Sequence, residues 1–151
     1  MATPQTQPQS ESSLQLRRTF AASRERVFRA WTDAKEFALW FHPTTDHTTI
    51  ITQLDLKVGG KYSLEMHHKD GRIHRLSGSY QQIKPPERLS FTWRWAEDPA
   101  DQETLVSLEF RDLGNSTEIL LTHGQFPSDV SRERHNHGWM GCMDQLVSYL
   151  A

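Results

Sequence analysis

The spacing of apolar residues changes after Pro127, and this change limits the folds that the chain can adopt. From residue 49 to residue 123, apolar side chains recur at about every second position, which is typical of strands that bury one face. Beyond Pro127 they recur every three to four positions, which predicts one helix that ends near Leu150, with Ser128 or Asp129 as its cap. Strands followed by one long helix predict an α+β domain in which a curved antiparallel sheet packs on that helix.

The residues before this region add a strand and two short helices to the predicted order. The alternation of apolar residues over Leu14–Phe20 predicts a strand. Ser23 and Asp33 are expected to cap two short amphipathic helices, since their side chains can accept hydrogen bonds from the first turn. Residues 1–13 contain almost nothing apolar, so we expect a disordered tail before a single domain over residues 14–151.

Turn-forming residues divide the alternating region into about six strands, which gives a sheet of about six to seven strands in all. The first is expected over residues 49–58. The breaks are Gly59–Gly60, Asp70–Gly71, Pro85–Pro86, the acidic segment 96–103 and Leu113–Ser116. We expect a bulge or a longer loop at Asp70–Gly71, because a two-residue loop would place Leu76 and Tyr80 on the face opposite Leu64.

Composition excludes several classes of function. The net charge is −2 and no basic stripe stands out, so we expect no nucleic-acid partner. Cys142 is the single cysteine and cannot form a disulfide within the chain. There is no apolar run of about 18 residues and no secretory signal pattern, so we expect no membrane insertion and a cytoplasmic protein.

The histidine-rich segments do not predict a metal site. On a helix, His135 and His137 project about 200° apart, so they cannot bind one ion. His67, His68 and His74 flank the Asp70–Gly71 turn, but the pairing of two of them supplies too few ligands for zinc, which binds three or four protein ligands. We therefore predict no metal and no cofactor.

The sequence also predicts no catalytic residue. Cys142 faces inward among apolar residues, which makes a thiol unreactive. No G-x-S-x-G motif is present for a serine nucleophile. Gly59–Gly60 lies between strands without a following helix, so it does not form a phosphate-binding loop.

Several stretches together resemble a known family. They include VFRAWTD, PPERL-x-FTW and H-x-x-GW, and the similarity extends over about residues 14–151. The chain resembles the START-like (SRPBCC) superfamily, and within it the stand-alone proteins similar to the C-terminal domain of the heat-shock protein 90 ATPase activator. This resemblance implies a helix-grip fold, in which the sheet wraps around the C-terminal helix and leaves a cavity between them. The superfamily contains lipid carriers, polyketide cyclases, hydrolases and co-chaperone domains, so function has to be argued from the site.

Inward-facing aromatic and sulfur-containing residues are the candidate lining of that cavity. They come from two strands, from the last strand and from the long helix: Tyr62, Leu64, Met66, Phe91, Trp93, Trp95, His123, His135, Trp139 and Met143. His123, His135, Tyr62 and Arg18 are the expected polar points on an otherwise apolar wall. Gly138 and Gly141 remove side-chain volume from the helix, which indicates either a close backbone approach or vacant space.

Three functional hypotheses follow. The first is a binding protein for a small hydrophobic or aromatic molecule, in which His123 and His135 orient one polar group of the ligand. The second is an enzyme of the cyclase or hydratase type, with one of these histidines as general acid or base. The third is a chaperone-associated interaction protein that uses the acidic segment 97–103. The chain is expected to be a monomer or a homodimer.

Overall fold

The computed structural model describes residues 13–99 and 102–151, and within them the predicted order of elements is found. The predicted tail, residues 1–13, lies outside the described residues except for Ser13. The elements are β1 (Leu14–Phe20), α2 (Arg24–Thr32), α3 (Ala34–Trp40), β2 (His47–Leu54), β3 (Lys61–His68), β4 (Ile73–Lys84), β5 (Arg88–Trp95), β6 (Thr104–Asp112), β7 (Thr117–Gly124) and α4 (Asp129–Leu150).

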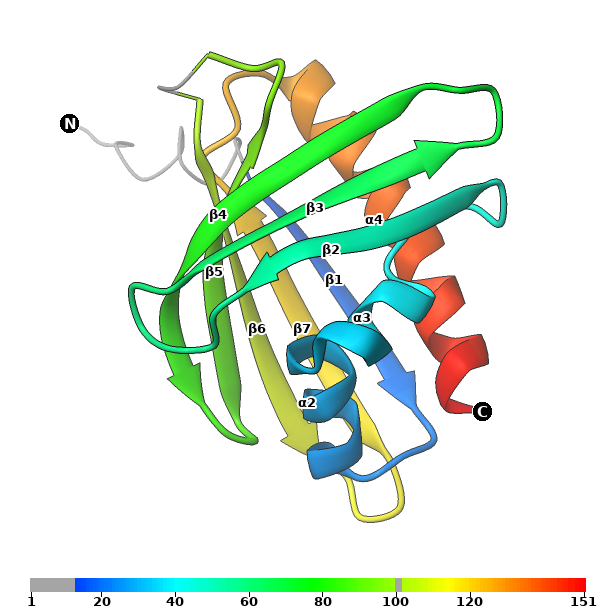
Figure 1. Ribbon diagram of the computed structural model, residues 1–151. Coiled ribbons are helices and arrows are strands. Elements are labelled where there is room, and N and C mark those ends of the chain that lie inside the picture. The colour runs from blue at the N-terminus through cyan, green and yellow to red at the C-terminus, as the bar shows by residue number, and fades with distance from the viewer. Residues whose placement is uncertain (1–12, 100–101) are drawn as a thin grey trace, which may run out of the picture.

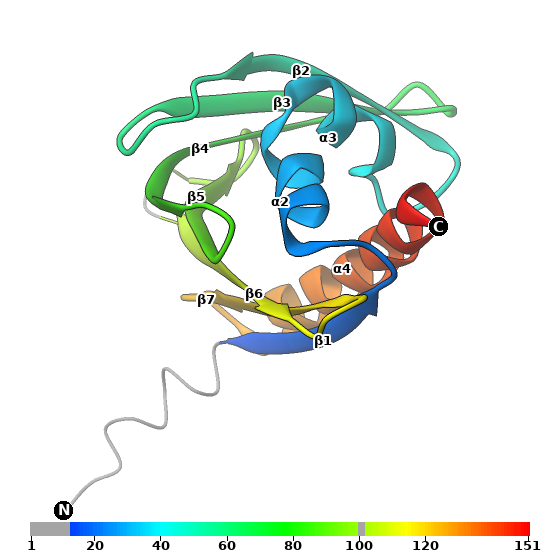
Figure 2. The same ribbon diagram turned by 90° about the horizontal axis from the view of Figure 1, so that it is seen from below.

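The strands form one antiparallel sheet in the order β1-β7-β6-β5-β4-β3-β2. Figure 1 shows the long α4 running along the inner side of the sheet. Seen from below, the sheet curves around α2 and α3, and α4 lies across its open side (Figure 2). This arrangement confirms the predicted α+β fold, a curved sheet wrapped around a C-terminal helix.

Three side chains cap the helices as the sequence predicts. Ser23 Oγ accepts a hydrogen bond from the backbone N–H of Arg26 at 3.2 Å, and Asp33 Oδ1 accepts one from that of Glu36 at 3.1 Å. At the start of α4, Ser128 Oγ accepts from the backbone N–H of Ser131 at 3.1 Å. Each cap satisfies one of the N–H groups that a helix leaves without a partner in its first turn.

The strand expected over residues 49–58 is wrong at both ends, because β2 begins at His47 and ends at Leu54. The apolar alternation continues through Leu56 and Val58, but these side chains are exposed. The backbone turns here instead, with the N–H of Gly60 bonded to the carbonyl of Lys57 at 2.7 Å. Alternation without burial therefore misplaced the end of the strand.

The hairpin between β3 and β4 has the longer loop that the sequence predicts. His68 and Arg72 close this loop, with Leu64 opposite Leu76. Met66 lies opposite His74, which places His74 on the inner face of the sheet. A cross-strand pair of His67 with His74 therefore does not form.

Aromatic side chains from α2 and α3 fill one end of the concave face. Trp31 and Trp40 are in edge contact at 4.7 Å between ring centroids, and Phe37 stacks on Phe41 at 4.3 Å. The indole N–H of Trp40 donates to the carbonyl of Ala30 at 2.8 Å, so its polar atom is satisfied within the core. All four rings are buried.

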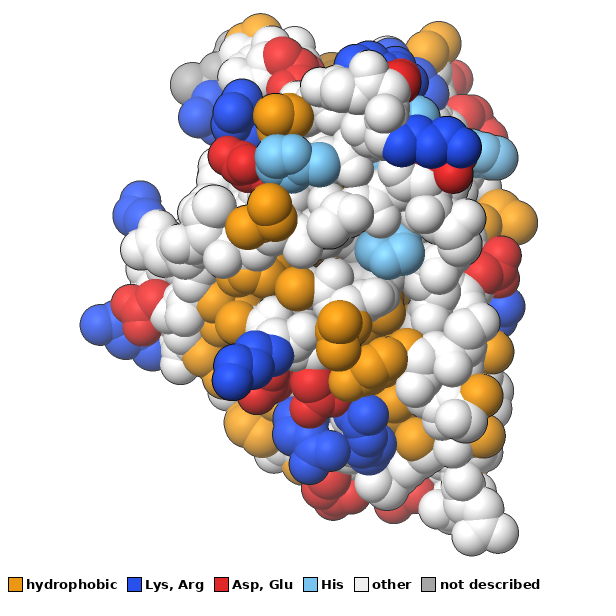
Figure 3. All heavy atoms as spheres, turned by 45° about the vertical axis from the view of Figure 1, so that its right-hand side comes forward, with side chains coloured by type: hydrophobic (Ala, Val, Ile, Leu, Met, Phe, Trp, Pro, Cys, Tyr) orange, Lys and Arg blue, Asp and Glu red, His pale blue; other side chains and the backbone are white. Residues whose placement is uncertain are grey.

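Some apolar side chains are exposed on the surface of the protein. Leu39 on α3 is 66% exposed, and Ile50 and Ile73 on the outer side of the sheet are partly exposed. Figure 3 shows a face on which hydrophobic side chains gather in the middle, with charged side chains below them. Among the described residues, no helix is both long and apolar enough to cross a bilayer.

Candidate ligand-binding site

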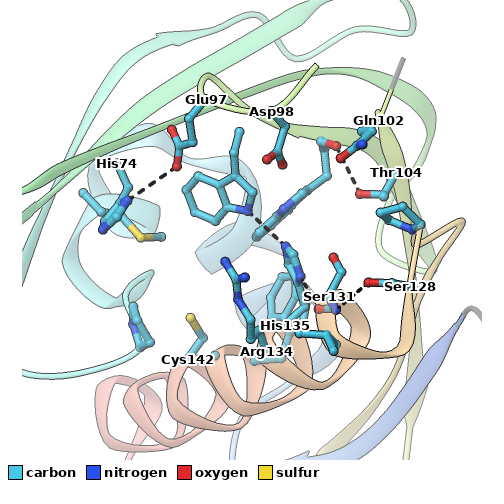
Figure 4. Close-up of a pocket in the computed structure, with 18 of the residues that line it drawn as sticks. His74, Glu97, Asp98, Gln102, Thr104, Ser128, Ser131, Arg134, His135 and Cys142 are labelled. Carbon is cyan, nitrogen blue, oxygen red and sulfur yellow. Dashed lines mark hydrogen bonds and ion pairs between the residues drawn. The ribbon is translucent and has the colours of Figure 1, made fainter. Parts of the chain in front are cut away.

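A cavity of about 600 Å³ lies between the sheet and the N-terminal half of α4 (Figure 4). Its apolar wall includes Pro43, Met66, Trp93, Trp139 and Cys142. Trp93 and Trp139 pack against each other at 5.1 Å between ring centroids, which gives this wall a continuous aromatic surface. The cavity is therefore large enough and apolar enough to hold a small organic molecule.

Charged and polar side chains line another part of the same cavity. Glu97 and Asp98 come from the turn after β5, His74 from β4 and Arg134 from α4. His74 Nδ1 lies 3.6 Å from a carboxylate oxygen of Glu97 (Figure 4). The site thus combines an apolar wall with a charged edge.

His135 is held by two hydrogen bonds within the protein. The indole N–H of Trp95 donates to His135 Nε2 at 3.0 Å, and His135 Nδ1 donates to the carbonyl of Ser131 at 2.7 Å. Both bonds require a neutral ring with its proton on Nδ1. Burial lowers the pKa of His135, which keeps the ring in this neutral form.

His123 repeats this arrangement deeper in the core. The indole N–H of Trp139 donates to His123 Nδ1 at 3.0 Å, and His123 Nε2 donates to the hydroxyl of Thr104 at 2.7 Å. The Thr104 hydroxyl in turn donates to the carbonyl of Trp93 at 3.1 Å. Burial, with a smaller contribution from the nearby His135, holds the pKa of His123 well below its ordinary value. Neither imidazole has a ring nitrogen left for a ligand.

The two glycines of α4 have different structural roles. The sequence indicates either a close backbone approach or vacant space, and each of these is found at one of the two glycines. A Cβ atom at Gly141 would lie 2.2 Å from the carbonyl oxygen of Pro43, so the backbones approach closely there. A Cβ atom at Gly138 would meet nothing within 4 Å, and Gly138 lines the cavity. Gly138 therefore leaves vacant space on the wall formed by α4.

The structure brings five of the ten candidate residues together at the cavity. They are Met66, Trp93, Trp95, His135 and Trp139. Their contact with a ligand stays a prediction.

The other five candidates lie elsewhere in the core. Tyr62 and Phe91 border a separate void of about 10 Å³ beside Trp31, which is about the size of one water molecule. Leu64, His123 and Met143 are buried and do not line the cavity.

Two of the expected polar points are also bonded away from the cavity. Arg18 forms an ion pair with Asp144 at 2.6 Å, on the outer part of α4. The Tyr62 hydroxyl donates to the backbone carbonyl of Thr92, and burial raises its pKa. Neither group is therefore available to orient a ligand in the cavity.

Sequence reasoning missed the charged edge of the site. In the sequence, His74 flanks the Asp70–Gly71 turn, and Glu97 and Asp98 lie in the acidic segment between two strands, so neither position indicates a cavity. The register of the β3–β4 hairpin would have placed His74 inward. Arg134 precedes His135 by one residue, which puts it about 100° away and at the border of the inner face of α4.

The positions of His135, His137 and Cys142 on α4 agree with helical geometry. His135 is half-buried and faces the cavity, whereas His137 is exposed. Cys142 is buried and its burial raises the pKa of the thiol, so the thiolate that reacts as a nucleophile is disfavoured. Among residues 13–99 and 102–151, no three histidine, cysteine, aspartate or glutamate side chains are arranged to hold a metal ion.

The curved sheet, the gripped C-terminal helix and the cavity between them define a helix-grip protein. Residues 21–151 match the family described as Activator of Hsp90 ATPase homolog 1-like protein. The chain belongs to this family, which confirms the resemblance found in the sequence. No curated protein matches the chain.

Solved bacterial structures are similar to this chain over most of their length. A protein of Chromobacterium violaceum is 25% identical with a TM-score of 0.83, and the match covers 92% of this chain and 96% of that one. The AHSA1 protein of Silicibacter pomeroyi is 26% identical with a TM-score of 0.80, covering 92% and 97%. A protein of Arthrobacter aurescens, 22% identical with a TM-score of 0.82 over 93% and 87%, shares the fold.

Proposed function

We propose that this protein binds a small hydrophobic or aromatic molecule in the cavity between the sheet and α4. The observation that carries the proposal is a cavity of about 600 Å³ with an aromatic wall, left open by Gly138. Ligand pockets in proteins commonly have volumes of about 300–1,000 Å³ and mostly apolar walls. Trp93, Trp139 and Met66 would supply the contact area.

The expected affinity follows from the area that a ligand can bury. A two-ring aromatic compound that buries about 250 Å² of apolar surface gains about 6 kcal/mol at 25 cal/mol per Å². Part of this gain is lost to immobilising the ligand. A net gain of about 4–6 kcal/mol corresponds to dissociation constants between about 40 μM and 1 mM, which is the range that we expect.

The two histidines support binding rather than acid–base catalysis. His123 and His135 each accept a hydrogen bond from an indole and donate one within the protein. A proton transfer to a substrate would first have to break one of these bonds. We propose that both rings position the tryptophans of the wall, since Trp139 and Trp95 donate to them.

A fluorescence titration with N-phenyl-1-naphthylamine, an uncharged aromatic probe, tests the binding proposal. We expect saturable binding to the unaltered chain and at least a tenfold loss in Gly138→Leu, whose side chain would occupy the vacant space. Met140→Leu is the matched control, because Met140 lies on the same helix and is 51% exposed. An absence of saturable binding, or equal binding in Gly138→Leu and the control, would overturn the proposal.

A chaperone-associated role is the second candidate, and the family description supports it. It predicts that the middle domain of heat-shock protein 90 captures this chain in a pull-down experiment. Recovery of no protein would contradict this role without affecting the binding proposal. The cytoplasmic location and the monomeric or homodimeric state stay predictions.

A further inference from the structure

Arg134 has an unusual position among the arginines of this protein. Arg18 and Arg26, like most of the others, form ion pairs with carboxylates. Arg134 is an exposed residue at the edge of the cavity; it lines the cavity and points into it (Figure 4), and it forms no ion pair within the described residues. A guanidinium that points into a cavity from its edge without a carboxylate partner presents a positive charge to whatever occupies the cavity.

The acidic side chains of the charged edge do not neutralise this guanidinium. Glu97 is engaged by His74 at 3.6 Å. Asp98 comes from the turn after β5, and Figure 4 shows it on the side of the site opposite Arg134. No ion pair joins Asp98 to Arg134 among the described residues. Arg134 is therefore the group of the cavity that can receive a negative charge.

The neighbouring histidine cannot take over this role. Both ring nitrogens of His135 are bonded, one to Trp95 and one to Ser131, and the neutral ring carries no charge. These bonds also hold the indole of Trp95 beside the cavity. The apolar wall and the single guanidinium are thus presented together to a ligand.

We infer that the ligand of this cavity carries an anionic group, such as a carboxylate, which pairs with the guanidinium of Arg134. The inference rests on the proposed function and specifies the chemical class of its ligand. A guanidinium can donate two parallel hydrogen bonds to a carboxylate, and such charge-assisted bonds are stronger than those between neutral groups. The apolar body of the ligand lies against Trp93 and Trp139, so the ligand is an organic acid with a hydrophobic part.

Two probes with the same aromatic body separate the charge from the apolar contact. 8-Anilinonaphthalene-1-sulfonate carries a sulfonate that N-phenyl-1-naphthylamine lacks. We expect the unaltered protein to bind the sulfonate probe more tightly. Arg134→Met should weaken binding of the sulfonate probe about tenfold and leave the affinity for the uncharged probe unchanged. The difference in affinity between the two probes should then no longer depend on salt concentration.

Arg94→Met is the matched control variant. Arg94 also forms no ion pair within the described residues, but it does not line the cavity. This variant should bind both probes as the unaltered chain does. Arg134→Lys keeps the charge but loses the planar fork, so its affinity for the sulfonate probe should lie between those of the unaltered chain and Arg134→Met.

The outcomes distinguish the two claims. One outcome overturns only the inference that the ligand is anionic. In it, the uncharged probe binds saturably, but Arg134→Met and Arg94→Met bind the sulfonate probe with equal affinity. Absence of binding of either probe overturns the proposed function as well. If dodecanoate displaces the sulfonate probe and 1-naphthoate does not, the ligand belongs to the aliphatic acids. The reverse result would assign it to the aromatic acids.

Discussion

The concave face of the sheet has two ends with different interiors. At one end, Trp31 and Trp40 are buried among the rings that α2 and α3 contribute. At the other end, Trp93 and Trp139 form the wall of a cavity of about 600 Å³. The space over the concave face is therefore filled where α2 and α3 cover it and open where the N-terminal half of α4 covers it.

The difference lies in the helices and not in the strands. The segment of α2 and α3 brings four large rings to the sheet: Trp31, Phe37, Trp40 and Phe41. The N-terminal half of α4 brings Gly138 to the same concave face. Strand alternation therefore decides only that a side chain points inward, whereas the covering helix decides whether that space is filled.

Replacing a tryptophan of the filled end should produce the largest effect. Trp40→Ala removes a buried ring and its hydrogen bond to Ala30, so we expect a loss of about 3–5 kcal/mol in the free energy of unfolding. Trp95→Ala at the cavity edge removes a half-buried ring and should cost less than about 2 kcal/mol. Urea denaturation measures both values, and equal losses would remove the distinction between the two ends.

Mild acid should destabilise the protein through His123 and His135. Burial lowers the pKa of His123 and His135 in the folded state, so the unfolded chain binds protons first. Stability is then complete above the unfolded pKa of about 6.5 and falls below it, by up to about 1.4 kcal/mol per pH unit for each ring. Glu36 and Glu109 have lowered pKa values, so their contribution is lost only below the ordinary carboxylate range near 4.5.

Urea denaturation between pH 8 and pH 5 measures this dependence. His135→Gln should reduce the slope between pH 6.5 and pH 5. The exposed His137 provides the control, and His137→Gln should retain the slope of the unaltered chain. A stability that stays constant down to pH 5 would contradict the neutral, bonded state of the two buried rings.

The glycines of α4 should respond in opposite directions to the same substitution. Gly141→Ala places a Cβ atom against the Pro43 carbonyl and should cost about 1–3 kcal/mol. Gly138→Ala places it in vacant space and should stabilise the protein by up to about 1 kcal/mol, because alanine favours a helix. Thermal denaturation of both variants provides the measurement. A loss in Gly138→Ala comparable to that in Gly141→Ala would show that the cavity side of α4 is packed.

The smallest effect is expected at Arg18, which the sequence placed at the cavity. Its ion pair with Asp144 is largely exposed, so Arg18→Gln should change the free energy of unfolding by about 0–1 kcal/mol. Binding of the uncharged naphthylamine probe should be unaltered, in contrast to the loss of at least tenfold that we expect in Gly138→Leu. A loss of probe binding in Arg18→Gln would return this arginine to the site.

The fold could be read from the sequence because alternation and capping are local signals. Ser23, Asp33 and Ser128 cap their helices as predicted, and Leu64 and Leu76 meet across the hairpin as their shared face requires. The end of β2 could not be read, since Leu56 and Val58 alternate without being buried. Local patterns thus fix elements and faces but not the limits of burial.

The site could be predicted only in part for the same reason. Tyr62 and Phe91 point inward as expected, but they lie at the end that α2 and α3 fill. Trp93 and Trp95 continue the same face toward the cavity. Arg134 and His74 required the position of α4 and the hairpin register, which are tertiary features with no local signal in the sequence.

The five tryptophans allow the central claim to be tested in one experiment. Their indole N–H groups give separate signals in a two-dimensional ¹⁵N–¹H NMR spectrum of the labelled protein, and three of these residues line the cavity: Trp93, Trp95 and Trp139. On titration with N-phenyl-1-naphthylamine, we expect the signals of these three to shift progressively to a limit, while those of Trp31 and Trp40 stay in place. Unchanged spectra, or shifts centred on Trp31 and Trp40, would contradict a binding site between the sheet and α4.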